Sequence, residues 1–339
     1  MTAPRAAAGP RVTFAIRPLG AMIGPAVFVL PDGRQVSPLH IAPWEDDPAA
    51  ADLPGILRAL RGEWPCVPFG YSVPVTGDTP ARWAGLLGAA EPGEEVHGPS
   101  SNSVWRWEES APGALSLSLD YPPDHPVRRV ERVVAADPAA AALDFTLRIE
   151  TRAACTLPLG LHFTFALPAR PGSARIDPGA FRTGRTYPGT VEPGGAAFAI
   201  DRTFADLSAV PDRDGGAVDA SAVPLQGAVE ELLQLDGTLG EAALARPAEG
   251  WRARLTWDPQ VFPSLLLWYS NRGRTAAPWD GRHLALGMEP ICSPFGFGPA
   301  TARGANPVSA EGTPTARAFD PGESIETRYR LEVEAIKGA

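Results

Sequence analysis

Four segments of the chain alternate apolar and polar residues strictly, and this pattern constrains the possible fold more than any other feature. The segments are residues 115–121, 143–150, 251–258 and 325–334. Successive side chains of a β-strand point to opposite faces, so a period of two gives each strand one buried face and one wet face. This pattern is typical of antiparallel sheets that pack face to face. The sequence therefore predicts an all-β fold, a large antiparallel β-sandwich.

Turn-forming residues agree with many short strands. The 339 residues include 35 Gly and 38 Pro, which is high for a helical protein. Residues 12–16 and 26–30 predict two strands that form a hairpin at one edge, and residues 1–10 predict a loose N-terminus. The stretch 169–223 mixes aromatic and turn residues and predicts a meander of short strands. We expect a single domain over residues 1–339, because large β-sandwiches exceed the usual domain size.

The stretch from residue 53 to residue 70 predicts two further local structures. Residues 53–62 can hold a short helical turn. Pro65 and Pro68 prevent a helix from continuing, so residues 61–70 predict a rigid, extended loop.

Charge and composition exclude several classes of function. Lys and Arg number 30 against 39 Asp and Glu, a net charge of −9 without a basic cluster, so we expect no nucleic-acid partner. No apolar run is long enough to span a bilayer and the first residues do not resemble a signal peptide, which predicts a cytoplasmic protein without membrane contact. Cys66, Cys155 and Cys292 show no CxxC spacing, which argues against a disulfide framework or a structural zinc site.

One carboxylate stands inside an apolar run. Residues 284–288 predict a buried strand, Glu289 follows, and Pro290, Pro294 and Gly296 are expected to turn the chain into a loop. A carboxylate at the mouth of a buried strand loses solvation, which raises its pKa above the usual value of about 4.3 and suits a general base. The alternative is a buried Glu paired with an Arg, and the strand alone favours this alternative.

The five histidines differ in their sequence context. His40, His125 and His283 lie beside Pro or Arg and predict surface positions. His97 precedes Gly98 in a loop of small residues that could let a ligand approach the backbone. His162 lies in an apolar strand that turns aromatic, a plausible place for a side chain facing a pocket. A satisfied structural histidine remains the alternative for each of them.

Five motifs together carry a family resemblance. They are residues 61–70 (RGEWPCVPFG), 97–105 (HGPSSNSVW), 159–165 (LGLHFTF), 262–268 (FPSLLLW) and 288–290 (MEP). In this order they resemble the galactose mutarotase superfamily of aldose 1-epimerases, nearest its branch related to hexose-6-phosphate epimerases. The resemblance implies the large antiparallel β-supersandwich of that superfamily.

The resemblance also implies a chemistry. In such enzymes a glutamate takes the proton of the anomeric hydroxyl while a histidine protonates the ring oxygen, and the ring opens and closes to the other anomer. Carried over by motif, Glu289 is the base, His162 the acid and His97 a second donor near the ring oxygen. The implied substrate-binding residues are Arg61, Asn102, Phe165 and Trp268. No metal or organic cofactor is expected, since no hydride or electron moves, and the expected assembly is a monomer or a homodimer.

Two departures from the motifs bear on the substrate. Ser101 stands where the family usually has Arg, and Glu63 stands where the branch has a second Gly. Loss of an Arg beside an added acid argues against a phosphorylated substrate and favours a neutral sugar. No residue matches the family's substrate-binding aspartate, since Asp236 lies in an ordinary turn context. The alternatives to an enzyme are a non-catalytic carbohydrate-binding protein on the same fold and a structural sandwich domain of a larger carbohydrate-active enzyme.

Overall fold

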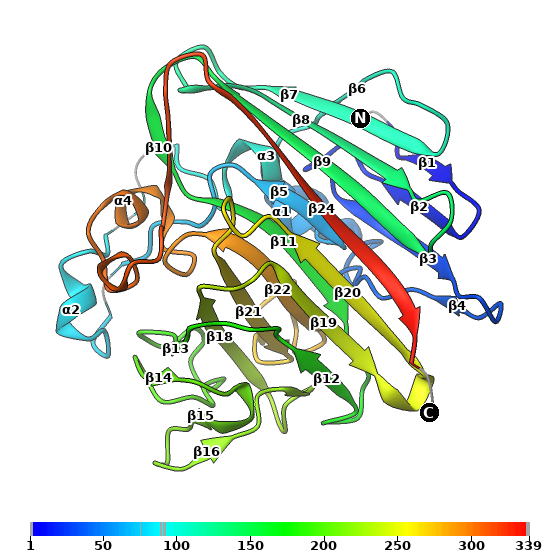
Figure 1. The fold of residues 1–339 in the computed structure, drawn as a ribbon. Coiled ribbons are helices and arrows are strands. Elements are labelled where there is room, and N and C mark those ends of the chain that lie inside the picture. Colours follow the sequence, from blue (N-terminus) through cyan, green and yellow to red (C-terminus); the bar gives the residue numbers. More distant parts are fainter. Residues whose placement is uncertain (1–2, 75, 89, 91–92, 337–339) are drawn as a thin grey trace.

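Two large antiparallel sheets form the body of the protein in the computed structural model, which describes residues 3–74, 76–88, 90 and 93–336 (Figure 1). The first sheet runs in the order β1 (Arg5–Ala8), β2 (Val12–Ile16), β3 (Ile23–Val29), β5 (Glu63–Cys66), β11 (Leu159–Ala166), β22 (Leu284–Cys292), β21 (Ser264–Asn271), β18 (Val229–Asp236), β13 (Thr183–Thr186) and β14 (Thr203–Phe204), with β4 (Gln35–Val36) beside β3. The second runs β17 (Ala222–Val223), β12 (Ala174–Asp177), β19 (Glu241–Arg246), β20 (Trp251–Trp257), β24 (Ser324–Ala335), β9 (Ala142–Thr151), β8 (Val127–Ala136), β7 (Ala114–Asp120) and β6 (Arg106–Trp107).

Smaller elements connect the sheets. Two further strand pairs are β10 (Cys155–Leu157) with β23 (Arg317–Phe319), and β15 (Val210–Pro211) with β16 (Ala217–Val218). The α-helices are the short α1 (Gly55–Ala59), α2 (Ala81–Ala84), α3 (Gly98–Asn102) and α4 (Gly298–Arg303), and 3-10 turns cover Pro48–Asp52, Leu207–Ala209, Pro247–Glu249 and Ser309–Glu311. In the described part of the chain, none of these helices has the length and apolar character needed to cross a membrane.

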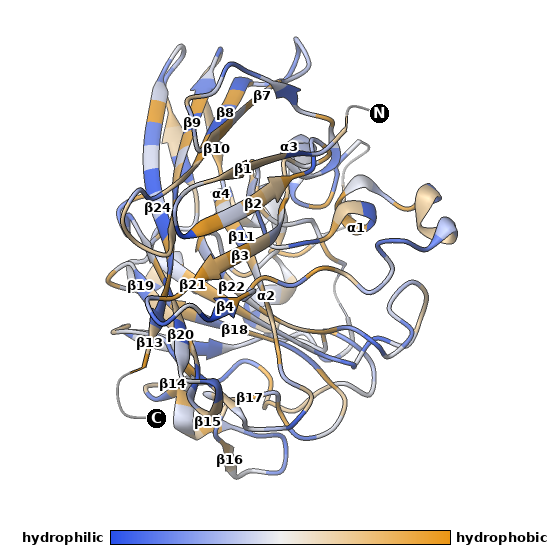
Figure 2. Ribbon diagram, turned by 90° about the vertical axis from the view of Figure 1, so that its right-hand side faces the viewer, coloured by the Kyte–Doolittle hydropathy of each residue, from blue (hydrophilic) through white to orange (hydrophobic). Residues whose placement is uncertain are grey.

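The alternating segments form the strands that their pattern predicts. They become β7, β9, β20 and β24, and the burial of β24 alternates from Ser324 to Glu334. Figure 2 shows the same alternation as hydrophilic and hydrophobic bands along this strand. The predicted meander is also confirmed, because the short strands β12 to β17 lie between residues 169 and 223. The predicted helical turn is α1.

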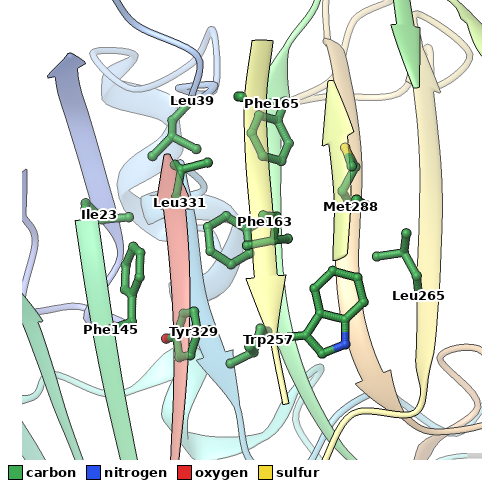
Figure 3. Packing of buried hydrophobic residues seen from close by; sticks show 14 of the residues in the cluster. Ile23, Leu39, Phe145, Phe163, Phe165, Trp257, Leu265, Met288, Tyr329 and Leu331 are labelled. Atoms are coloured by element: carbon green, nitrogen blue, oxygen red, sulfur yellow. The ribbon is translucent and has the colours of Figure 1, made fainter. Parts of the chain in front are cut away.

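The main core fills the space between the two sheets. Phe163 and Phe165 of β11 project toward the second sheet and meet Phe145, Tyr329 and Leu331 from β9 and β24 (Figure 3). Phe145 and Tyr329 stack with ring centroids 4.6 Å apart. Each fully buried side chain of this size contributes roughly 1.5–3 kcal/mol through the hydrophobic effect, so this layer holds the two sheets together.

A second hydrophobic cluster lies on the other face of the first sheet. It is rich in tryptophan, and its largest members are Trp44, Trp64, Trp83, Trp268 and Trp279. Residues from the α1 and α2 segments pack on it, so this face is covered by loops and short helices rather than by a sheet. Side chains that alternate along β11, β21 and β22 therefore point either into the main core or into this loop-covered layer.

Two local predictions are corrected by the structure. The N-terminus is not loose throughout, because Arg5–Ala8 forms β1 and pairs with β2. The segment predicted as an extended loop contains β5, in which Trp64 pairs with His162 of β11. Pro65 holds its neighbourhood extended, as expected, and that same geometry is what pairing with β11 requires.

The strand that carries Glu289 is longer than the sequence predicts. β22 continues to Cys292, so Glu289 lies within the strand and not at its end. Pro290 remains paired with Leu265 of β21. On the other side, the ladder with β11 is interrupted between Ile291 and Gly287. The missing N–H of Pro290 therefore falls where a break in the ladder already exists.

A buried ion pair connects the two sheets through the core. Glu63 of β5 and Arg132 of β8 are both fully buried, and Glu63 Oε2 lies 2.5 Å from Arg132 Nη2. The Tyr329 hydroxyl donates to Glu63 Oε1 at 2.8 Å, and Arg132 Nη1 donates to the Ala21 carbonyl at 2.7 Å. Glu63 thus faces the core, so it contributes no carboxylate to the layer on the other side of β5.

Candidate active site

Strand register brings three of the predicted site residues onto one face of the first sheet. Thr164 of β11 lies opposite Gly287 of β22, which places His162 level with Glu289. Gly287 also lies opposite Trp268 of β21. Because residues two apart and residues directly opposite share a face, His162, Glu289 and Trp268 all point into the loop-covered layer.

A cavity of ≈ 450 Å³ opens above these three side chains. His97, from the loop before α3, completes its polar end together with His162 and Glu289. Most of the remaining wall is apolar or aromatic, with Ile56, Leu57, Leu60, Phe69, Val73, Tyr187, Leu232, Leu266, Trp268 and Trp279. A few convergent polar groups in a largely apolar concave site are the usual form of a small-molecule binding site.

Glu289 and His162 face each other at the base of the cavity. Glu289 Oε1 lies 3.4 Å from His162 Nε2, and the two residues are only 2% and 6% exposed. Among the described residues, no arginine pairs with Glu289, so the structure does not show the ion pair that was the alternative for a buried glutamate. Burial raises the pKa of Glu289 well above its ordinary value. Burial, and then the neighbouring His97, lower the pKa of His162.

His97 is held in one tautomer by the backbone. The Gly70 N–H donates to His97 Nδ1 at 3.0 Å, which leaves the ring proton on Nε2. Burial lowers the pKa of His97 to about 4, so the neutral ring is its state near neutral pH. Its ring lies 5.3 Å from that of His162 in an edge-to-face arrangement. His97 therefore offers an N–H donor and no charge.

The small residue after His97 serves the chain itself. A Cβ on Gly98, which has a φ of +71°, would lie 2.7 Å from the Val67 carbonyl oxygen and 2.6 Å from Pro68 Cδ. Gly98 is therefore required so that two loops of the protein can pass each other closely. The sequence led us to expect a ligand close to the Gly98 backbone, but residues 67 and 68 of the protein occupy that space.

Ser101, which replaces the arginine of the resembling motif, supports His162 indirectly. Its hydroxyl donates to the His97 carbonyl at 2.9 Å and accepts from Trp64 Nε1 at 3.0 Å. The Trp64 ring stacks on His162 with centroids 4.0 Å apart and planes inclined by 15°. Ser101 thus fixes the aromatic platform under His162 and brings no positive charge to the cavity.

Three predicted substrate-binding residues lie outside the cavity wall. Arg61 is 1% exposed and pairs with Glu45 at 2.6 Å. Asn102 accepts from the Ile56 N–H and donates to two backbone carbonyls, so it joins the α1 segment to the His97 loop. Phe165 points into the core between the sheets (Figure 3). Arg61 and Asn102 shape the loops around the site, whereas Phe165 belongs to the core.

Two expectations about polar residues change with the structure. His283, expected at the surface, is 1% exposed, because its ring packs against Trp268 and Trp279. Its Nδ1 lies 2.8 Å from Ser270 Oγ. Asp236 is also buried and pairs with Arg185 at 2.6 Å. It does not line the cavity, so it cannot take the place of the family's substrate-binding aspartate.

Sequence reasoning missed Arg274, which lines the cavity together with Trp268 and Trp279. Its guanidinium carbon lies 4.6 Å from the ring centroid of Trp279 and 5.7 Å from that of Trp268. Arg274 is the third residue after β21, in the stretch Asn271-Arg272-Gly273-Arg274. A run of polar residues just beyond the Phe-Pro-x-Leu-x-Leu-Trp motif was the available signal.

Gly287 makes room for the Glu289 carboxylate, which gives a test of the site's geometry. A Cβ at this position would lie 2.5 Å from Glu289 Oε1 and 2.8 Å from Trp268 Cβ. We expect Gly287→Ala to displace the carboxylate, to lower the free energy of unfolding by about 1–3 kcal/mol, and to impair any activity of the Glu289–His162 pair. Urea unfolding and catalytic assays measure the two effects.

A matched control for Gly287→Ala is Gly304→Ala. Gly304 is exposed at the end of α4, and a Cβ there would meet its nearest neighbours at 3.8 Å. Its unfolding free energy and activity should stay close to those of the wild type. Equal behaviour of the two variants would contradict the packing described around Glu289.

Comparison with protein-family models finds no match, and comparison with curated proteins finds none either. Solved structures do match over the whole chain. A candidate aldose 1-epimerase from Escherichia coli K12 is 18% identical, with a TM-score of 0.64 over 98% of this chain and 99% of its own. The aldose epimerase homologue from C. elegans is 14% identical, with a TM-score of 0.62 over 99% and 100% of the two chains. A galactose mutarotase-like protein from Lactobacillus casei is 13% identical, with a TM-score of 0.59 over 98% and 100%.

These similarities settle the fold. The chain has the antiparallel β-sandwich fold of aldose 1-epimerase and galactose mutarotase-like proteins, which confirms the architecture predicted from the alternation and the motifs. At identities this low the likeness concerns the backbone arrangement, and function has to be argued from the site.

Proposed function

We propose that the protein is an aldose 1-epimerase, which interconverts the α and β anomers of a non-phosphorylated sugar. The observation that carries the proposal is the placement of Glu289 Oε1 3.4 Å from His162 Nε2 at the base of a cavity that His97 also lines. Ring opening of a cyclic sugar needs one group that accepts the anomeric proton and another that donates to the ring oxygen. A carboxylate and an imidazole side by side in one cavity can supply both.

Each polar group has one proposed role. Glu289 accepts the proton of the anomeric hydroxyl, and His162 donates a proton to the ring oxygen as the bond between that oxygen and C1 breaks. The Nε2–H of His97 donates a second hydrogen bond at or near the ring oxygen of the sugar, and this bond holds the sugar in place. Reversal of these transfers on the other face of the rotated carbonyl closes the ring to the second anomer. Trp268 offers an apolar surface to the C–H groups of the sugar.

The reaction requires one proton on the Glu289–His162 pair, and this predicts its pH dependence. Burial raises the pKa of Glu289 and lowers that of His162, so the pair keeps a single proton over a wide range around neutral pH. The rate should fall on the alkaline side when the pair loses this proton, above the raised pKa of Glu289. The rate should fall on the acid side only when the pair takes up a second proton, on His162. Because the pKa of His162 is lowered, this happens below the ordinary value of 6.5.

The pH prediction is tested by the rate of anomer exchange between about pH 4 and pH 10, a range that spans the ordinary values of both groups. A flat region across neutral pH agrees with the coupled pair. A rate that rises tenfold for each unit of pH through neutrality would show instead that the reaction needs the fully deprotonated pair or hydroxide, and it would contradict this prediction.

Features of the cavity support a non-phosphorylated substrate. Ser101 carries no charge, and its hydroxyl is hydrogen-bonded to Trp64 Nε1 and to the His97 carbonyl. Arg61 lies outside the cavity wall and is paired with Glu45. Among the described wall residues, Arg274 alone is an arginine or lysine. Recognition of a phosphate commonly uses several such cations. Glu63, which the sequence suggested as an opposing charge, plays no part because it faces the core.

Exchange spectroscopy by NMR tests the proposal directly. One anomeric proton is saturated in the presence of the protein, and transfer to the other anomer is followed for glucose, galactose, mannose, xylose, arabinose and the hexose 6-phosphates. We expect acceleration for at least one neutral aldose and its loss in Glu289→Gln. No acceleration for any sugar, with ligand shifts still visible, would identify a carbohydrate-binding protein in place of an enzyme.

A cytoplasmic site of action remains part of this proposal.

A further inference from the structure

Arg274 occupies the cavity wall in a fixed position. Its Nε lies 3.1 Å from Glu230 Oε1, and its guanidinium lies near the rings of Trp268 and Trp279. Among the described residues, none accepts a hydrogen bond from Nη1 or Nη2. The side chain is 30% exposed, so these N–H groups can reach a ligand in the cavity.

Glu230 is a buried anchor and does not line the cavity itself. Its Oε1 accepts from Trp268 Nε1 at 2.6 Å and forms the ion pair with Arg274 Nε, and its Oε2 accepts from Ser270 Oγ at 3.0 Å. Burial raises the pKa of Glu230, while the charge of Arg274 and the hydrogen bonds from Trp268 and Ser270 oppose this rise by stabilising the carboxylate. The loop fits closely over it, since a Cβ on Gly273 would lie 2.7 Å from Glu230 Cβ.

We propose that Arg274 is a specificity-determining residue that binds hydroxyl groups of an uncharged aldose, and that Glu230 sets this preference by neutralising its charge. The inference rests on the proposed function for the identity of the ligand. The pair presents N–H donors with no net charge, which suits hydroxyl oxygens. An anionic substituent beside Arg274 would also lie near ionised Glu230, and the repulsion would offset much of the attraction.

The variant Glu230→Gln isolates this charge effect. A glutamine whose oxygen takes the place of Oε1 still accepts from Trp268 and stays beside Arg274 Nε, and its amide N–H₂ can donate to Ser270 Oγ. The substitution therefore removes one negative charge and keeps all three contacts. Arg274 then presents an uncompensated positive charge to the cavity.

Binding of a neutral sugar and its anionic analogues tests the proposal. Glucose, glucuronate and glucose 6-phosphate are titrated against each protein, with the galactose series in parallel, by calorimetry or by the fluorescence of the cavity tryptophans. We expect the wild type to bind the neutral sugar most tightly. In Glu230→Gln the ratio of anionic to neutral affinity should rise roughly tenfold to hundredfold. Arg274→Met should weaken neutral binding roughly tenfold and remove the gain when combined with Glu230→Gln.

A control and a second readout keep the outcomes separate. Glu241→Gln removes the same charge from an exposed position of β19 and should leave the affinity ratio unchanged. A wild type that prefers the anionic sugars, a ratio that does not change in Glu230→Gln, or no binding of any of these sugars would overturn the proposal. A shifted ratio without anomer exchange would instead retain the role of Arg274 and reject the epimerase activity.

Discussion

Replacing Glu289 by Gln is expected to slow anomer exchange by roughly 10²- to 10⁴-fold, the usual contribution of a positioned general base. Glutamine has nearly the same size as glutamate and fits beside Gly287 and His162, so the cavity should keep its shape. The affinity for the sugar should therefore change much less than the rate. Exchange spectroscopy gives the rate, and calorimetric titration of the same sugar gives the affinity.

The same variant should be more stable than the wild type at high pH. Burial raises the pKa of Glu289 in the folded state. The contribution of Glu289 to folding stability is therefore fully present below its unfolded pKa of 4.5, and it is lost as the pH rises through the folded pKa. Glutamine has no such dependence. Urea unfolding at a series of pH values should show the difference growing toward alkaline pH. A variant that is less stable than the wild type at every pH would contradict the account of Glu289 as a buried carboxylate without a cationic partner.

Replacing Glu63 by Ala is expected to lower the free energy of unfolding by about 3–5 kcal/mol, the usual cost of removing one partner of a buried ion pair. The change leaves Arg132 charged and fully buried in the core, and it removes the acceptor of the Tyr329 hydroxyl. These contacts link β5 of the first sheet to β8 and β24 of the second. Urea unfolding followed by circular dichroism measures the loss.

The exposed pair Arg328–Glu326 provides the matched control. It lies on the wet side of β24, with side chains 78% and 49% exposed and a separation of 3.0 Å. Glu326→Ala should change the unfolding free energy by less than about 1 kcal/mol, since exposed ion pairs contribute little. If Glu63→Ala cost no more than this control, the buried network would not be what couples the two sheets.

The fold could be predicted because its signal is repeated along the chain. Alternation in the segments that become β7, β9, β20 and β24 shows both that strands form and that each has one buried face. Two strands were harder to see. β1 consists of an arginine and three alanines, and β5 contains a proline. Both depend on pairing with neighbouring strands, which is a tertiary effect that local pattern does not record.

The motifs predicted which residues meet at the polar end of the cavity, but not what surrounds them. His97, His162, Glu289 and Trp268 do lie together. The motif assigns Arg61 to the substrate but does not reveal which way its side chain points, and in the structure this side chain pairs with Glu45. The remaining wall depends on how loops pack over the sheet, which a single sequence does not specify.

Glu230 shows a second limit of sequence reasoning. Its partners Trp268, Ser270 and Arg274 come from β21 and the loop after it, 38 to 44 residues further along the chain. Only the register between β18 and β21, with Glu230 opposite Ser270, brings them together. The local pattern around Glu230 therefore gives no sign of these partners.

A double-mutant cycle tests whether Glu289 and His162 act as one unit on a sugar. Exchange rates are measured for the wild type, Glu289→Gln, His162→Gln and the double variant with the aldose that the wild type accelerates most. Groups that act together lose activity in a strongly non-additive way. We therefore expect the double variant to be about as slow as the slower single variant. Losses that multiply independently, or a wild type that accelerates no aldose, would contradict it.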